Sequence, residues 1–224
     1  MTSAFCSACG FALREDTPRA GSAEAREERR IVSVLFADLA GSTALGGRLD
    51  PEDVRELQGE LFEFLNAEVE RHGGMTEKFV GDAVMAVFGV PQAHEDDPER
   101  AVRAALALRD AFPEFAGRVR STHAHEVALR IGVNTGEVVS SRESAARGEL
   151  VVSGDPVNVA ARLQQRAAPG EILVGIRTRT AAQRAVAFAG PRAIEAKGKD
   201  DPVEAWVALE VVSRPTRRGV EGLS

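Results

Sequence analysis

Hydrophobic and polar positions along this chain repeat with a period that changes from one segment to the next. Residues 31–37 are apolar, β-branched or aromatic almost throughout, which predicts a buried strand. Residues 51–72 instead carry apolar side chains three and four apart, with a proline in the first turn and a Gly-Gly pair just beyond the end, which predicts an amphipathic helix. Its apolar positions are Val54, Leu57, Leu61 and Leu65.

The same two periods continue through the rest of the chain. Residues 75–89 predict two strands that fold back on each other at Gly81 and Asp82. The further predicted elements are a helix at 96–112, a strand, glycine-bearing turn and return strand within 127–139, a helix at 155–167 and a strand at 170–175. The order β-α-β-β-α-β, followed by additional αβ elements, predicts an α+β fold with a ferredoxin-like core.

The bulk composition is typical of a soluble globular protein. Of 224 residues, 44% are hydrophobic and 28% are charged, and the net charge is −6 at pH 7. This acidic balance argues against a nucleic-acid binder that uses a large basic surface. No apolar run approaches the roughly 18 residues of a membrane-spanning helix, and the N-terminus lacks the pattern of a signal peptide. We therefore expect a cytoplasmic protein that binds neither nucleic acid nor membrane.

Composition divides the chain into four segments. Residues 1–10 form a small head that holds both cysteines, and residues 11–29 are rich in Ala, Glu, Arg and Gly, as a linker is. Residues 30–210 contain the predicted folded domain, and residues 211–224 have the composition of a second linker. A linker at that place predicts a longer protein.

Two aspartates end apolar strands. Asp38 closes the first predicted strand, and Asp82 lies at the predicted hairpin tip. These strands are neighbours in a ferredoxin-like sheet, so the two carboxylates can converge, and a divalent cation between them relieves their repulsion. Hard oxygen ligands favour Mg²⁺ or Mn²⁺ that also binds substrate phosphates. The structural alternative makes Asp38 a helix cap and Asp82 a turn residue.

The turn after Asp38 and the third predicted helix add groups that suit an anion. Gly41, Ser42 and Thr43 lead toward a helix start, where free backbone N–H groups suit a phosphate. Asn158 and Arg162 lie four apart on one helix face, and an amide beside a guanidinium suits a sugar oxygen and a phosphate. Taken alone, this pair fits an ordinary solvated helix face equally well.

Five stretches together resemble the catalytic domain of class III nucleotide cyclases, in that family's order and spacing. They are FADLAGST, EKFVGDAVMAVFG, RIGVNTGEVV, GDPVNVAARL and EAKGKDDPVEAW, and the likeness covers residues 30–210. The resemblance implies the class III cyclase fold and the conversion of ATP to 3′,5′-cyclic AMP and pyrophosphate. It also implies a head-to-tail homodimer with two active sites at the subunit interface. A lone chain is then expected to be inactive.

The resemblance implies a site for two Mg²⁺ or Mn²⁺ ions at Asp38, Leu39 and Asp82. One ion would activate the ribose 3′-hydroxyl for attack on the α-phosphorus, and the other would hold the triphosphate. Lys197 matches the lysine that binds the outer phosphates, with Lys199 as the alternative two residues further on.

The partner chain would supply the residues that hold the nucleoside. Asn158 matches the asparagine that orients the ribose, and Arg162 matches the arginine that stabilises charge on the α-phosphate. Lys78 matches the lysine that contacts adenine N1 in the adenylyl-forming members. Where the family commonly has Asp or Thr for the adenine amino group, this chain has Val151. Ser153, two residues on and on the same strand face, is a partial substitute.

The cysteines raise a separate possibility of zinc binding. Cys6 and Cys9 form a C-x-x-C pair followed by glycine, which is one half of a tetrahedral zinc site. None of the four histidines has the spacing to complete it, so a vestigial reduced knuckle is the alternative. Similar cyclase domains often follow a short zinc ribbon and precede an ATPase module, and the linker-like tail fits fusion to a downstream regulatory or ATPase module.

One favoured function and two alternatives therefore follow from the sequence. The favoured one is a metal-dependent adenylate cyclase that works as a homodimer. The alternatives are a catalytically weak, dimerising regulatory module that senses nucleotide, and an enzyme with relaxed ATP/GTP specificity. The presence of Asp38, Asp82, Asn158 and Arg162 together favours the enzyme, whereas Val151 favours the alternatives.

Overall fold

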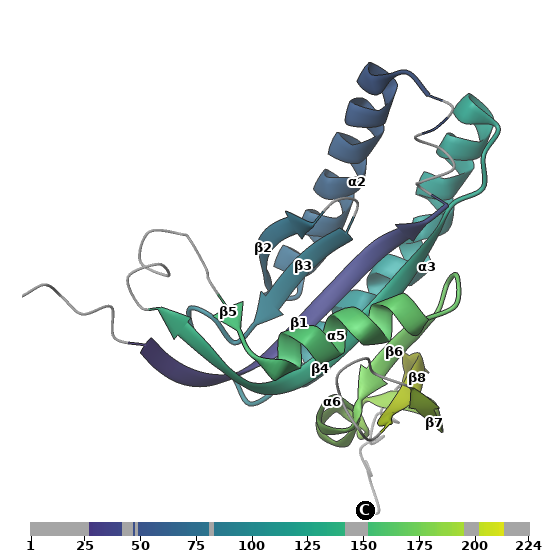
Figure 1. Cartoon of the computed structure of the whole chain (residues 1–224). Coiled ribbons are helices and arrows are strands. Elements are labelled where there is room, and N and C mark those ends of the chain that lie inside the picture. Colours follow the sequence, from purple (N-terminus) through teal and green to yellow (C-terminus); the bar gives the residue numbers. More distant parts are fainter. Residues whose placement is uncertain are drawn as a thin grey trace, which may run out of the picture.

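A computed structural model describes residues 27–41, 47, 49–80, 83–141, 152–194 and 202–212. In this part of the chain, eight strands form one sheet with helices on both of its faces (Figure 1). The strands are β1 (Glu27–Ala40), β2 (Met75–Val80), β3 (Ala83–Phe88), β4 (Ala128–Ser141), β5 (Val152–Ser153), β6 (Ile172–Gly175), β7 (Val186–Ile194) and β8 (Val203–Val211). The helices are α2 (Pro51–Arg71), α3 (Asp97–His123), α5 (Asp155–Arg166) and α6 (Ile176–Ala182).

The order of the strands confirms the predicted fold class. Along the sheet it is β2-β3-β1-β4-β6-β8-β7, and β5 pairs with β4. The first four strands with α2 and α3 form the βαββαβ core, in which β1 pairs antiparallel with both β3 and β4. β6 adds to β4 in parallel, and β8 and β7 extend the sheet antiparallel. Of the helices in the described part, none combines the length and apolarity that spanning a bilayer requires.

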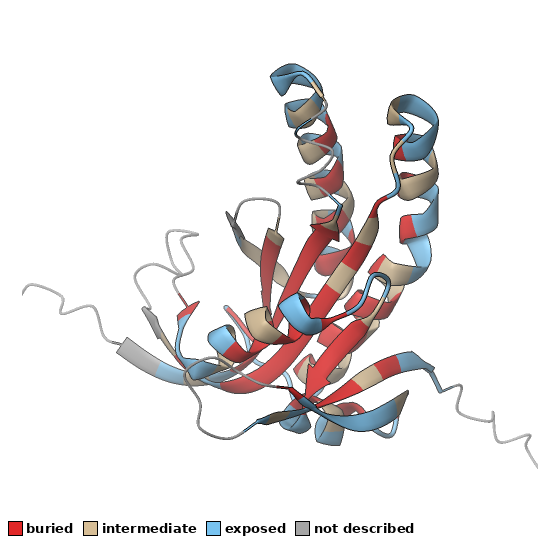
Figure 2. Cartoon of the chain, turned by 45° about the vertical axis from the view of Figure 1, so that its right-hand side comes forward, coloured by how far each residue is buried: buried red, intermediate tan, exposed pale blue. Residues whose placement is uncertain are grey.

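Alternation along β1 sends its side chains to two different cores. Leu35, Ala37 and Leu39 pack with α2 and α3, whereas Val34 and Phe36 pack on the opposite face with α5. Figure 1 shows α5 in front of the sheet and α3 behind it, and in Figure 2 the central strands are buried over most of their length. The central strand is therefore covered on both faces, which explains its nearly continuous apolar sequence.

Helix α3 is longer than predicted. The expected helix at 96–112 stops before Pro113, but α3 continues through this proline to His123. Proline inside a helix removes a backbone hydrogen bond and costs about 3 kcal/mol. Beyond it, Phe115 and Val119 are 1% and 2% exposed and belong to the core under α2 and α3. Burial of these two side chains offsets the cost of the proline.

The predicted turn within 127–139 is wrong, because β4 is one continuous strand of 14 residues. The glycines that suggested a turn instead let α5 approach the sheet. A Cβ atom on Gly132 would lie 2.3 Å from the Ala160 carbonyl oxygen and 2.3 Å from the Gln164 nitrogen, and one on Gly136 would lie 2.5 Å from Pro156 Cγ. No side chain larger than hydrogen fits at either position while α5 keeps its place.

Candidate active site

Asp38 lies near the C-terminal end of β1, on the face of the sheet that α5 covers. Its cross-strand partners are Ala83 at the start of β3 and Arg130 in β4. The prediction that the first strand and the hairpin are neighbours is therefore confirmed. Asp82 precedes Ala83 in the sequence and lies outside the described residues. Asp38 is 8% exposed, so its carboxylate needs compensation from within the protein.

Two side chains of the same chain supply that compensation. The Arg130 guanidinium donates through Nη2 to Asp38 Oδ2 and forms an ion pair with it. The Gln164 amide of α5 donates through Nε2 to the same oxygen at 2.8 Å. The sequence pointed to a divalent cation as the positive partner of Asp38, and the structure adds an arginine. We refer to Asp38, Arg130 and Gln164 as the Asp38 cluster.

Neither Arg130 nor Gln164 was among the residues that the sequence singled out. The one signal for Arg130 is its place as a charged residue within the otherwise apolar run 127–133. Its meaning depends on the register between β1 and β4, which join residues 92 positions apart. Gln164 lies two residues after Arg162, and only the packing of α5 on β4 turns it toward Asp38.

The Asp38 cluster has the chemistry of a site for a cation and an anion together. Asp38 and the Leu39 carbonyl offer hard oxygen donors of the kind that Mg²⁺ and Mn²⁺ prefer. Arg130 Nε is buried and has no hydrogen-bond acceptor among the described residues, so the guanidinium keeps a donor for an anionic oxygen. Within the described residues no group of three or more His, Cys, Asp or Glu side chains is arranged for a metal. These donors fit a metal bound jointly by protein and phosphate oxygens.

The remaining predicted site residues occupy three different elements. Lys78 is exposed on β2, Ser153 is exposed on β5, and Gly41 follows β1 with a φ of +98° that suits glycine. Asn158 is exposed and Arg162 is half-buried on α5. The predictions at Ser42, Thr43, Asp82, Val151, Lys197, Cys6 and Cys9 fall outside the described residues.

Asn158 and Arg162 do not join the Asp38 cluster of their own chain. The neighbouring positions Val159 and Leu163 are buried against the sheet, and Gln164 is the α5 side chain that hydrogen-bonds Asp38. Asn158 and Arg162, four apart, therefore lie together on a more exposed side of the helix.

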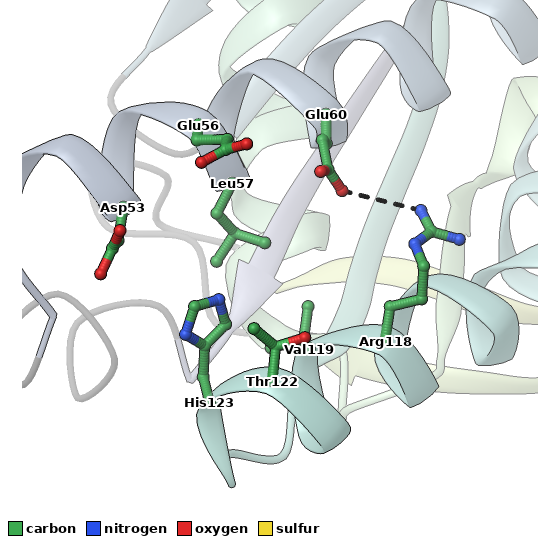
Figure 3. A pocket seen from close by; sticks show the side chains of 8 residues that line it. All are labelled: Asp53, Glu56, Leu57, Glu60, Arg118, Val119, Thr122 and His123. Carbon is green, nitrogen blue, oxygen red and sulfur yellow. Dashed lines mark ion pairs between the residues drawn. The ribbon is translucent and has the colours of Figure 1, made fainter.

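A hollow between α2 and α3 lies apart from all these residues. Figure 3 shows Asp53, Glu56 and Glu60 of α2 facing Arg118 and His123 of α3, and the only ion pair drawn there joins Glu60 and Arg118 at 3.8 Å. Both partners of that pair are more than half exposed, so solvent screens it. The hollow belongs to the helices on the other face of the sheet from Asp38 and contains no predicted site residue.

Comparison with known proteins identifies the family. The sequence model of the adenylate and guanylate cyclase catalytic domain matches residues 24–209. This chain belongs to that family. The resemblance seen in the five sequence stretches is therefore confirmed for the domain as a whole.

Solved cyclase structures share the fold. The adenylyl cyclase CyaB from P. aeruginosa superposes with a TM-score of 0.77 at 27% identity, over 84% of this chain and 97% of that one. The guanylyl cyclase Cya2 gives a TM-score of 0.77 at 30% identity, over 85% and 97% of the two chains. One neighbour is named for each nucleotide, so the likeness favours neither ATP nor GTP.

Relatives of similar sequence are longer proteins. An uncharacterised protein of Mycobacterium tuberculosis is 34% identical over 181 residues, which are 79% of this chain and 32% of the relative. An uncharacterised protein of Rhizobium meliloti is 32% identical over 208 residues, 88% of this chain and 20% of the relative. The chain thus spans a third or less of the length of these two relatives.

Proposed function

We propose that this domain converts ATP to 3′,5′-cyclic AMP and pyrophosphate at active sites shared between two copies of the chain. The observation that carries the proposal is the Asp38 cluster, a buried carboxylate held by Arg130 and Gln164 opposite the first residue of β3. A buried acid at this place costs stability. Binding of a nucleotide-bound cation is a function that would account for that cost.

Asp38, the Leu39 carbonyl and Asp82 would hold Mg²⁺ or Mn²⁺. When bound, the ions would make the ribose 3′-hydroxyl more acidic and would neutralise negative charge on the triphosphate. Arg130 orients the Asp38 carboxylate through their ion pair before the nucleotide arrives. Its buried Nε–H donates to no acceptor among the described residues and would be free to donate to a phosphate oxygen.

Asn158 and Arg162 act on the nucleotide of the partner's site in this proposal. Their place on the more exposed side of α5, away from the Asp38 of the same chain, supports sharing of the site between chains. Arg162 would stabilise charge on the α-phosphate and Asn158 would orient the ribose. Lys197 would bind the outer phosphates, and backbone N–H groups at Gly41, Ser42 and Thr43 would lie along them.

Adenine is the base that Lys78 favours. Its side chain is 49% exposed on β2, where it can reach a ligand. Val151 offers no hydrogen bond to the adenine amino group, and the exposed Ser153 is the nearest described substitute. Zinc at Cys6 and Cys9 and fusion to a downstream module stay predictions beside this proposal.

Product formation tests the proposal directly. Purified protein at high concentration is incubated with Mn²⁺ and either ATP or GTP, and the cyclic product is quantified, with Asp82→Ala as the control. We expect cyclic AMP from the wild type and none from the variant. Nucleotide binding without any product would favour the second candidate, a dimerising regulatory module, which Val151 supports.

Mixing of two inactive variants tests the shared site. Asp38→Ala removes a metal acid and Arg162→Ala removes the group contributed by the partner, so each homodimer has two defective sites. A mixed dimer regains one complete site, and activity should return toward half of the wild-type value per mixed dimer. Lack of recovery in a heterodimer demonstrated by co-purification would contradict the shared site.

A further inference from the structure

Glu77 is a buried acid beside the base-reading lysine that the proposed function does not use. Its side chain is 3% exposed, whereas that of Lys78 is 49% exposed. Glu77 Oε1 accepts a hydrogen bond from Lys78 Nζ at 3.0 Å and a longer one from the Val152 backbone N–H at 3.4 Å. One carboxylate oxygen thus joins β2 to β5, the two strands that carry Lys78 and Ser153.

A regular strand would not allow this contact. Consecutive side chains of a strand point to opposite faces, so Glu77 and Lys78 would be separated by the sheet. The pairing of β2 with β3 shifts between Thr76 and Lys78, which leaves Glu77 as an extra residue without a cross-strand partner. Such a bulge turns a side chain away from its regular direction. Here it brings the Glu77 carboxylate to the ammonium of its neighbour.

The second carboxylate oxygen of Glu77 lowers the stability of the fold. Oε2 is buried and has no hydrogen-bond partner among the described residues. A buried acceptor without a donor destabilises the fold, and an apolar residue at this position would avoid the cost. A purely structural link to Val152 needs only a single neutral acceptor. The negative charge beside Lys78 is therefore the feature that calls for a function.

We infer that Glu77 is the positioning residue for nucleotide-base selection: it fixes the direction of the Lys78 ammonium and thereby sets the preference between adenine and guanine nucleotides. The inference rests on the proposed function, in which Lys78 contacts the base. Glu77 compensates for Val151 in this role, since a lysine held in one direction discriminates between bases better than a freely rotating one.

A double-mutant cycle tests the inference. The ratio of kcat/KM for ATP to that for GTP is measured for wild type, Glu77→Ala, Glu77→Gln, Lys78→Ala and the Glu77→Ala/Lys78→Ala double variant, and thermal melting checks each fold. Glu99→Ala is the matched control, because Glu99 also pairs with a neighbouring cation, Arg103 at 2.7 Å, but on α3. Dissociation constants for ATP and GTP are measured on the same samples.

Glu77→Ala should lower the ATP-to-GTP ratio about tenfold, the loss expected for one hydrogen bond to a charged group. Lys78→Ala should lower it similarly, and the double variant should fall no further. Glu77→Gln, which keeps an acceptor oxygen but removes the charge beside Lys78, should lower the ratio to a value between those of wild type and Glu77→Ala, and Glu99→Ala should leave it unchanged. An equal loss for both nucleotides in Glu77→Ala, or effects of Glu77 and Lys78 that multiply, would overturn the inference.

The two proposals fail in distinguishable ways. A wild type that forms no product but binds nucleotide ends the proposed catalysis, while the same cycle read from the two dissociation constants still decides the role of Glu77. A wild type that binds neither nucleotide overturns both. Turnover with normal selectivity in Glu77→Ala overturns the inference alone.

Discussion

The two faces of the central sheet are built for different tasks. Under α2 and α3 the core is apolar around Leu61, Leu65 and Phe88, which are at 1% exposure or less. Three phenylalanines from the two helices pack there with ring centroids 5.4 to 6.3 Å apart. The face under α5 has apolar clusters too, but beside them it contains the carboxylate, guanidinium and amide of the Asp38 cluster.

The difference arises from alternation in one strand. Leu39 faces the apolar core while Asp38, its neighbour, faces α5. The first face stabilises the domain by area removed from water, at about 25 cal/mol per Å². The second face buries less apolar area, because it holds the charged groups of the Asp38 cluster at the candidate active site. Substitutions on the first face should therefore change stability, and substitutions on the second should change chemistry.

The largest expected effect is on the α5 face. Asp38→Asn keeps the shape and an oxygen that can accept from Gln164 and Arg130, but removes the charge that would hold a cation. Turnover should fall by about 10³-fold or more, while the melting temperature changes little. Turnover and melting are measured on the same preparation. Retained activity would remove Asp38 from the proposed chemistry.

The next effect belongs to the opposite face. Phe115→Ala deletes a ring that is 1% exposed and leaves a cavity between α2 and α3. The free energy of unfolding should drop by about 3–5 kcal/mol, as urea denaturation measures it. Activity per folded molecule should stay near that of the wild type. If activity falls further than the folded fraction does, the two faces are not separable in function.

A smaller substitution should affect both properties at once. Gly132→Ala places a methyl group 2.3 Å from backbone atoms of Ala160 and Gln164, so α5 must move away from β4. Overpacking of this kind costs about 1–3 kcal/mol, and the movement of α5 draws Gln164 from Asp38. We expect a stability loss by urea denaturation together with reduced turnover. Unchanged turnover with lowered stability would show that the position of α5 is not critical for the site.

Sequence patterns predicted the elements whose local signals are strong. The apolar spacing of Leu57, Leu61 and Leu65 identified α2, and all three side chains are buried as expected. The apolar run at 83–88, after the predicted reversal at Gly81 and Asp82, identified β3. In both cases the signal lies within one turn or one strand of the residue it describes.

Contacts distant in sequence were beyond these patterns. Gly132 and Gly136 have the same local signature whether they form a turn or receive a helix, and only the tertiary packing of α5 decides between the two. The partners of Asp38 lie 92 and 126 residues away. Recognising Arg130 as the counter-charge requires the register of β1 against β4, which no single segment contains.

The smallest expected effect is that of a substitution on α2, which should change stability without changing the candidate active site. Gly59 is exposed in α2, and a Cβ atom there would meet nothing within 4 Å. Gly59→Ala should raise the free energy of unfolding by about 0.5–1 kcal/mol, because alanine loses less backbone entropy in a helix. Turnover should not change, since α2 contributes no residue to the Asp38 cluster. Compared with Gly132→Ala, the same added methyl group should have the opposite sign for stability. Loss of turnover in Gly59→Ala would instead connect α2 to the reaction.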